Sequence, residues 1–147
     1  MKKAVTVFAL LLFSLPLSIS AYGYTDLTVV EAKIKIDSSR SLVILDVRTQ
    51  SEYESGHIRN AKNIPVTELE GRLGEISNAD EILVYCKSGG RSATASQILT
   101  DNGFPHVYNM LEGITGWIDA GYPVYVKYSS IQGAMNMAYE GGTIFVA

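Results

Sequence analysis

The chain contains one cysteine, and this residue opens a short loop suited to holding a negative charge. The loop consists of six consecutive residues: Cys86, Lys87, Ser88, Gly89, Gly90 and Arg91. A strand-like apolar run (82–85) leads into it, and a helix-like stretch (92–102) follows. Backbone N–H groups and the positive end of a helix dipole both stabilise anions at such a place. The pattern therefore predicts a reactive thiolate at Cys86, rather than the small buried hydrophobe that a lone cysteine commonly is.

This thiol needs rigid elements around it, and strand-like and helix-like segments alternate along the chain. Apolar runs without alternation predict strands covered on both faces, as in a parallel sheet. Strands are predicted at 42–45, 82–85 and 106–109. Helices are predicted at about 28–37, 51–56, 67–76, 92–102 and 113–121. We therefore expect an α/β domain with a central, mostly parallel sheet flanked by helices on both faces, in which Asp46 and Cys86 lie at carboxyl ends of strands.

Local patterns indicate where several of these elements begin. Thr28 with Glu31, and Thr67 with Glu70, have the spacing of capping boxes and predict two helix starts. Pro65 disfavours helix at the residue before it, so residues 57–65 are expected to be extended.

The first 21 residues have the pattern of a secretory signal peptide. Lys2 and Lys3 precede a long apolar run, and the small residues Ser18, Ser20 and Ala21 follow it. We expect cleavage after Ser20 or Ala21 and an exported protein, in the periplasm, on the cell surface or secreted. The alternative is an uncleaved membrane anchor, because the run is nearly long enough to cross a bilayer.

Composition limits the classes of partner. The formal net charge is −3, and removal of the leader would remove two of the 12 basic residues and none of the 15 acidic ones, for a net charge of −5. An acidic chain without a basic run does not suggest a nucleic-acid partner. A single exported cysteine has no internal disulfide partner, so it is either inert or used.

Several segments together resemble the single-domain rhodanese (sulfurtransferase) family. These segments are 45–48, 52–53, 56–65, the loop 86–91 and 113–117. The resemblance runs from about residue 25 to 125, and it implies a rhodanese domain at 25–127 between the signal peptide 1–21 and a C-terminal extension 128–147 of unknown role. Within that extension, 129–138 is readable as a weak helix and 143–146 as a short β-like end.

The resemblance implies a reaction in two halves. Cys86 would attack the sulfane sulfur of a donor such as thiosulfate and become a persulfide, which a thiol or cyanide acceptor would then discharge. A protein persulfide partner is a further possible donor. We expect a monomer without a cofactor, and two isolated histidines and one cysteine make no credible metal site.

The remaining loop residues are predicted to bind the donor or to shape the loop. Gly89 and Gly90 let the backbone curl around the thiolate. Lys87 either attracts an anionic donor or is a solvated lysine, and Ser88 either donates its hydroxyl to the outer sulfur or belongs to the turn. Arg91 either faces the bound anion or holds the loop by pairing with a carboxylate, and we favour the second role because arginine forms rigid bidentate pairs.

Four other polar residues could be taken for an acid–base set: Asp46, Arg48, Glu52 and His57. In the family pattern they resemble scaffold, with Asp46 near the catalytic loop and Arg48 free to pair with Glu52. Sulfur transfer from thiosulfate to a thiolate needs no obligatory general base. His106 and the aromatic residues Tyr53, Tyr85, Tyr108 and Trp117 are expected to be structural.

Two other functions remain to be weighed. Phosphatases of the Cys…Arg type resemble this loop but place five residues between the two, whereas here four separate Cys86 from Arg91. The shorter loop makes a smaller cradle, suited to a sulfur atom. A persulfide carrier that serves one dedicated partner would have the same loop as a turnover enzyme.

Overall fold

The computed structural model describes residues 23–77 and 79–126. The expected signal peptide 1–21 and the extension 128–147, with its weak helix and β-like end, lie outside these residues. The described part forms a five-stranded sheet in the order β1-β5-β4-β2-β3, and every pair of neighbouring strands is parallel. The expected α/β architecture is thus confirmed.

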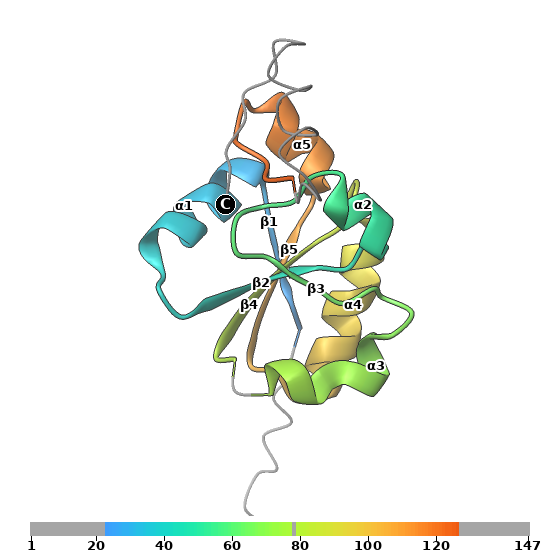
Figure 1. The fold of residues 1–147 in the computed structure, drawn as a ribbon. Helices are drawn as coiled ribbons and strands as arrows, with labels where there is room; N and C mark the ends of the chain where they lie inside the picture. The colour runs from blue at the N-terminus through green and yellow to red at the C-terminus, as the bar shows by residue number, and fades with distance from the viewer. Residues whose placement is uncertain (1–22, 78, 127–147) are drawn as a thin grey trace, which may run out of the picture.

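The strands of this sheet are short and run through the middle of the molecule (Figure 1). Their bounds are β1 Thr25–Leu27, β2 Leu42–Asp46, β3 Lys62–Asn63, β4 Glu81–Tyr85 and β5 His106–Met110. Sequence patterns did not predict β1, whose residues are mostly exposed. It forms because Thr25–Leu27 pairs in register with β5 at the edge of the sheet, which is a tertiary contact.

Helices cover both faces of the sheet. Their bounds are α1 Val29–Ser38, α2 Gln50–Glu54, α3 Leu69–Arg72, the 3₁₀ helix η1 Leu73–Ile76, α4 Gly90–Asp101 and α5 Gly113–Asp119. In Figure 1, α1 lies on one side of the strands and α3 and α4 lie on the other. No helix among the described residues has the length and apolar character needed to span a bilayer.

Two apolar cores follow from the alternation of side chains along the strands. In β4, Ile82 and Val84 pack with Leu99 of α4. Leu83 and Tyr85 point the other way and pack with helices α1 and α5. Cys86 continues this alternation and lies on the α4 face of the sheet.

The capping box predicted at Thr28 is present. Its hydroxyl accepts from the Glu31 backbone N–H, and Glu31 accepts from the Thr28 backbone N–H. The box predicted at Thr67 is wrong, because Pro65 and Val66 accept turn hydrogen bonds from Glu68 and Leu69. The helix consequently begins at Leu69 without a side-chain cap and becomes 3₁₀ after Arg72.

A second capping box, missed in the sequence, starts α2. The Thr49 hydroxyl accepts from the Glu52 N–H, and Glu52 Oε2 accepts from the Thr49 N–H at 3.0 Å. The segment expected to be extended after it is interrupted by a turn at Asn60, where φ is 61°. Only Lys62–Asn63 forms a strand, paired with the end of β2.

Candidate active site

The six-residue loop that begins at Cys86 connects the end of β4 to the start of α4, as predicted. Helix α4 begins two residues earlier than expected, at Gly90, so its N-terminus lies inside the loop. Gly89 takes a left-handed conformation with φ of 93°, and a Cβ there would clash with the Leu111 carbonyl. A side chain at this position would therefore push the loop away from the chain after β5.

Helix α5 holds the loop in place through two backbone hydrogen bonds. Ile114 N–H donates to the Cys86 carbonyl at 2.9 Å, and Thr115 N–H donates to the Lys87 carbonyl at 3.1 Å. Gly113 makes this approach possible because φ is 57° and a Cβ would lie 2.5 Å from the Lys87 carbonyl oxygen. The supporting residues lie in the segment 113–117 that the family resemblance included, but a supporting role could not be read from their types.

Cys86 is 1% exposed, and its thiol is surrounded by hydrogen-bond donors. Burial by itself raises the pKa of this thiol. The Ser92 hydroxyl and the backbone N–H groups of Ser92, Ser88 and Gly89 outweigh burial, so that the pKa lies below its ordinary value. The arrangement favours a buried thiolate, the form that attacks electrophilic sulfur.

The Ser92 side chain is a part of the site that sequence reasoning missed. Its backbone N–H was expected to face the thiolate, but its side chain was not singled out, and the hydroxyl lies 3.5 Å from Cys86 Sγ and donates to the Gly89 carbonyl at 2.9 Å. The side chain is fully buried. Its place two positions into a helix that follows a thiolate loop is a sequence signal that could have found it.

Arg91 forms the carboxylate pair that we favoured. Its two terminal nitrogens donate to the two oxygens of Glu52 at 2.8 and 2.7 Å. This bidentate pair lowers the pKa of Glu52 to about 2. The hydrogen bonds to Glu52 are the main cause of the raised pKa of Arg91, and the nearby charge of Cys86 raises this pKa further. Arg91 therefore links α2 to the loop while its charge remains near the thiolate.

The pairing expected between Arg48 and Glu52 is wrong. Arg48 Nε donates to both oxygens of Asp46 at 3.0 Å, and its terminal nitrogen donates to the Gly56 carbonyl at 2.7 Å. Asp46 and Tyr85 lie on the sheet face opposite Cys86 because side chains alternate along each strand. Glu52 is left free for Arg91.

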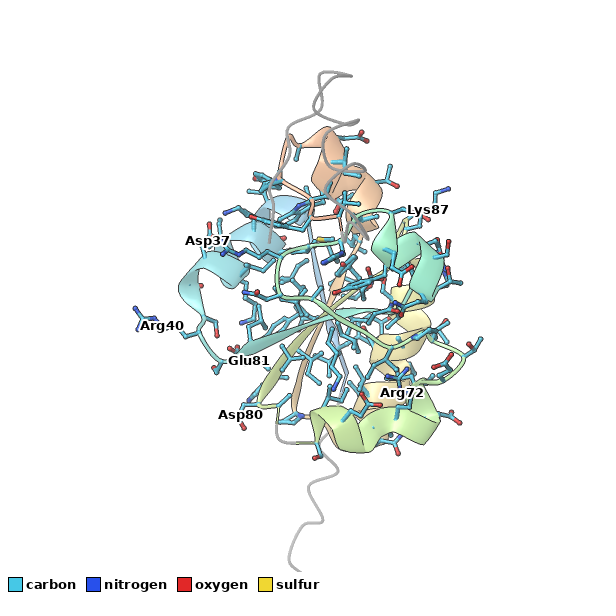
Figure 2. The ribbon with its side chains drawn as sticks, viewed as in Figure 1. Asp37, Arg40, Arg72, Asp80, Glu81 and Lys87 are labelled. Carbon is cyan, nitrogen blue, oxygen red and sulfur yellow. The ribbon has the colours of Figure 1, made fainter. Side chains whose placement is uncertain are left out.

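The other predicted residues occupy two kinds of position. Lys87 is exposed and points outward, at the end of the molecule away from Asp80 (Figure 2). His57 stacks on Tyr53 with ring centroids 3.9 Å apart and pairs through its backbone with Tyr125, so its contacts are structural. In the described part of the chain, no cluster of three or more His, Cys, Asp or Glu residues could hold a metal ion.

Both the sequence and the fold of this chain are similar to those of known proteins. A family model described as a rhodanese-like domain matches residues 28–120. The chain is 39% identical over 98 residues to YrkF of Bacillus subtilis, a proposed sulfur carrier protein, covering 67% of this chain and 53% of that protein. It therefore spans about half the length of this curated relative.

Two further matches cover more of the related protein. The thiosulfate sulfurtransferase GlpE of Coxiella burnetii is 36% identical over 78 residues, which are 53% of this chain and 73% of GlpE. The crystal structure of a rhodanese-related protein from Thermoplasma volcanium superposes with a TM-score of 0.64 at 32% identity, covering 71% of this chain and all of that one.

Proposed function

The chain belongs to the rhodanese-like domain family, and we propose that it is a sulfurtransferase that carries a sulfane sulfur as a persulfide on Cys86. The observation that carries the proposal is the buried Cys86 thiol, whose pKa is lowered by converging hydrogen-bond donors. The relationship to a thiosulfate sulfurtransferase supports the same reaction class. We further propose thiosulfate, or a similar anionic sulfane donor, as the substrate.

The first half-reaction loads the enzyme. The Cys86 thiolate attacks the outer sulfur of thiosulfate, a new S–S bond forms to Sγ, and the S–S bond of thiosulfate breaks. Sulfite leaves with the electron pair, so a total charge of −3 is kept on both sides. The N–H groups of Ser88 and Gly89 stabilise negative charge at this position throughout.

The second half-reaction unloads it. A thiolate or cyanide attacks the outer sulfur of the persulfide, the bond to Sγ breaks, and Cys86 is regenerated as a thiolate. No proton has to move in either half, which agrees with the structural contacts of His57. Covalent catalysis in two separate halves predicts ping-pong kinetics.

The polar residues of the loop have distinct roles in this reaction. The exposed Lys87 attracts the anionic donor to the mouth of the loop (Figure 2). The exposed Ser88 donates its hydroxyl to the outer sulfur. Arg91 holds the loop in place through Glu52 and keeps a positive charge beside the thiolate. These roles require no metal or cofactor.

A second candidate function is a persulfide carrier that serves one protein partner. The proposed carrier role of YrkF favours it, and so does the 1% exposure of Cys86, which limits access to the thiol. A phosphatase is disfavoured because the loop places only four residues between Cys86 and Arg91.

Mass spectrometry of the intact protein tests the function. Thiosulfate should add one sulfur, about 32 daltons, and cyanide should remove it. Cys86→Ser should fold normally and show no addition. Retained sulfur transfer in that variant would overturn the assignment. Sulfur uptake that is released only to a protein acceptor would favour the carrier.

We also propose that the domain works outside the cytoplasmic membrane as a monomer, with residues 1–21 as its leader. The support is the signal-peptide pattern of the sequence. N-terminal sequencing of the mature protein should begin near Ala21 or Tyr22. An intact Met1 in the membrane fraction would instead favour an anchor.

A further inference from the structure

The Ser92 hydroxyl is placed between two acceptors that compete for one proton. Its Oγ donates to the Gly89 carbonyl at 2.9 Å and lies 3.5 Å from Cys86 Sγ. A serine hydroxyl carries a single hydrogen that rotates about the C–O bond. Because the side chain is fully buried, solvent does not compete for this hydrogen. The charge on Sγ therefore decides which acceptor receives it.

That charge changes during the proposed reaction. In the free enzyme the negative charge is on Sγ, whereas in the persulfide it is on the outer sulfur and Sγ is a neutral sulfur with single bonds to Cβ and to the outer sulfur. Hydrogen bonds to ionised acceptors are roughly twice as strong as those to neutral ones. Sγ is thus the better acceptor in the thiolate, and the Gly89 carbonyl is the better one in the persulfide.

We propose that Ser92 is a catalytic hydrogen-bond donor that turns toward Cys86 Sγ in the thiolate and toward the Gly89 carbonyl in the persulfide. This inference rests on the proposed function and deepens it. When an acceptor thiolate RS⁻ attacks the outer sulfur, the S–S bond to Sγ breaks and its electron pair remains on Sγ, giving RSS⁻. The hydroxyl donates to that electron pair and keeps its own proton.

This change in hydrogen bonding should favour the second half-reaction, in which the persulfide is unloaded. A hydrogen bond that is weak in the persulfide and strong as Sγ departs stabilises the transition state more than the ground state, and so speeds the second half-reaction. The backbone donors cannot act in this way alone, because the N–H groups of Ser88 and Gly89 belong to a loop whose backbone is held by hydrogen bonds from Ile114 and Thr115. The Ser92 hydroxyl, by contrast, can rotate between Sγ and the Gly89 carbonyl as the charge moves.

The same helix offers a matched control. Ser96 lies one turn further along α4, is fully buried, and has a hydroxyl without a hydrogen-bond partner among the described residues. Ser96→Ala removes the same atom from the same helix without touching Sγ. Any effect particular to Ser92→Ala is therefore due to its contacts with Cys86 and Gly89.

The first experiment needs no sulfur donor. The alkylation rate of Cys86 by iodoacetamide is measured against pH in the wild type, Ser92→Ala and Ser96→Ala. Loss of the donor should raise the midpoint by about one pH unit in Ser92→Ala, because the thiolate loses a charge-assisted hydrogen bond. Ser96→Ala should keep the wild-type midpoint. An unchanged midpoint in Ser92→Ala overturns the proposal.

The second experiment separates the two half-reactions by intact mass, at a pH above both midpoints. Ser92→Ala should load sulfur from thiosulfate at least as fast as the wild type and unload it to a small thiol roughly tenfold more slowly. Equal slowing of both halves would show a purely structural role and overturn the proposal. If Ser92→Ala lacks the wild-type circular dichroism spectrum, Ser92→Thr is measured in both experiments. Threonine keeps a hydroxyl, so this variant should retain the wild-type midpoint and unloading rate, and a raised midpoint or slowed unloading in folded Ser92→Thr overturns the proposal.

Measurements on the wild-type protein distinguish a failure of the proposed function from a failure of the role proposed for Ser92. If it takes up no sulfur from thiosulfate, polysulfide or a protein persulfide, the proposed function fails and the Ser92 switch fails with it. If it loads and unloads normally while Ser92→Ala behaves identically, only the switch is overturned.

Discussion

Two arginine–carboxylate pairs lie near the carboxyl edge of the sheet, and they differ in almost every physical respect. Arg48 pairs with Asp46 two residues away, and the side chains are 7% and 0% exposed. Arg91 pairs with Glu52 across 39 positions of sequence, and these side chains are 36% and 32% exposed. Arg48 of the first pair lies 5.6 Å from the ring centroid of Tyr85, on the α1 face, while Arg91 of the second pair belongs to the thiolate loop.

This difference in burial assigns the Arg48–Asp46 pair to the scaffold of the fold and the Arg91–Glu52 pair to the active site. The buried pair is almost entirely shielded from water, so its two charges depend on each other and on the Gly56 carbonyl. The outer pair is partly exposed to water and therefore contributes little to the free energy of unfolding. It nevertheless connects α2 to the loop that holds Cys86. We therefore expect mutations in the first pair to affect folding, and mutations in the second to affect sulfur transfer.

The largest effect is expected for Asp46→Asn. This change leaves the Arg48 guanidinium buried without a counter-charge, which should lower the free energy of unfolding by about 3–5 kcal/mol. Urea denaturation measures it. Asp37→Asn, which breaks the exposed Lys33–Asp37 pair on α1, is the control and should cost about 0.5 kcal/mol or less. Similar losses in the two variants would contradict the distinction between buried and exposed pairs.

A smaller effect on stability is expected for Glu52→Gln. Glutamine at this position retains the capping box with Thr49 but removes the charge that holds Arg91. The free energy of unfolding should fall by about 1 kcal/mol or less, while sulfur loading of Cys86 slows several-fold. Glu54→Gln, on the same helix, should change neither quantity. A stability loss as large as that of Asp46→Asn would contradict a functional role for the outer pair.

The smallest effect is a dependence of stability on acidic pH. The pKa of Glu52 is lowered from 4.5 to about 2 by its hydrogen bonds with Arg91, despite some burial. A depressed pKa in the folded state stabilises the fold above the unfolded value, and this contribution is lost as pH falls from 4.5 toward 2. The stability gap between the wild type and Glu52→Gln should thus be constant above about pH 5 and close in acid. A gap that persists at low pH would mean that the pair does not lower this pKa.

Three identical local patterns show how far sequence reasoning reached. Thr28, Thr49 and Thr67 each stand three residues before a glutamate, yet only the first two cap a helix. At Thr67 the preceding Pro65 and Val66 form turn hydrogen bonds, so the helix begins too late for the threonine to cap it. A capping pattern is local, but whether it is used depends on how the chain enters the helix.

The sequence by itself determined the α/β class, the order of the strands and helices other than the edge strand β1, and the place of Cys86 at the end of β4. These features depend on runs of apolar residues, on glycines and on the short loop, which act over a few residues. The partners of Arg48 and Arg91 were decided only by the tertiary structure. Pairing of β2 with β4 places Asp46 and Cys86 on opposite faces of the sheet, and only then does Glu52 come within reach of Arg91. Support of the loop by Gly113 was decided in the same way, because β5 must first lie beside β4 to bring α5 beneath Cys86.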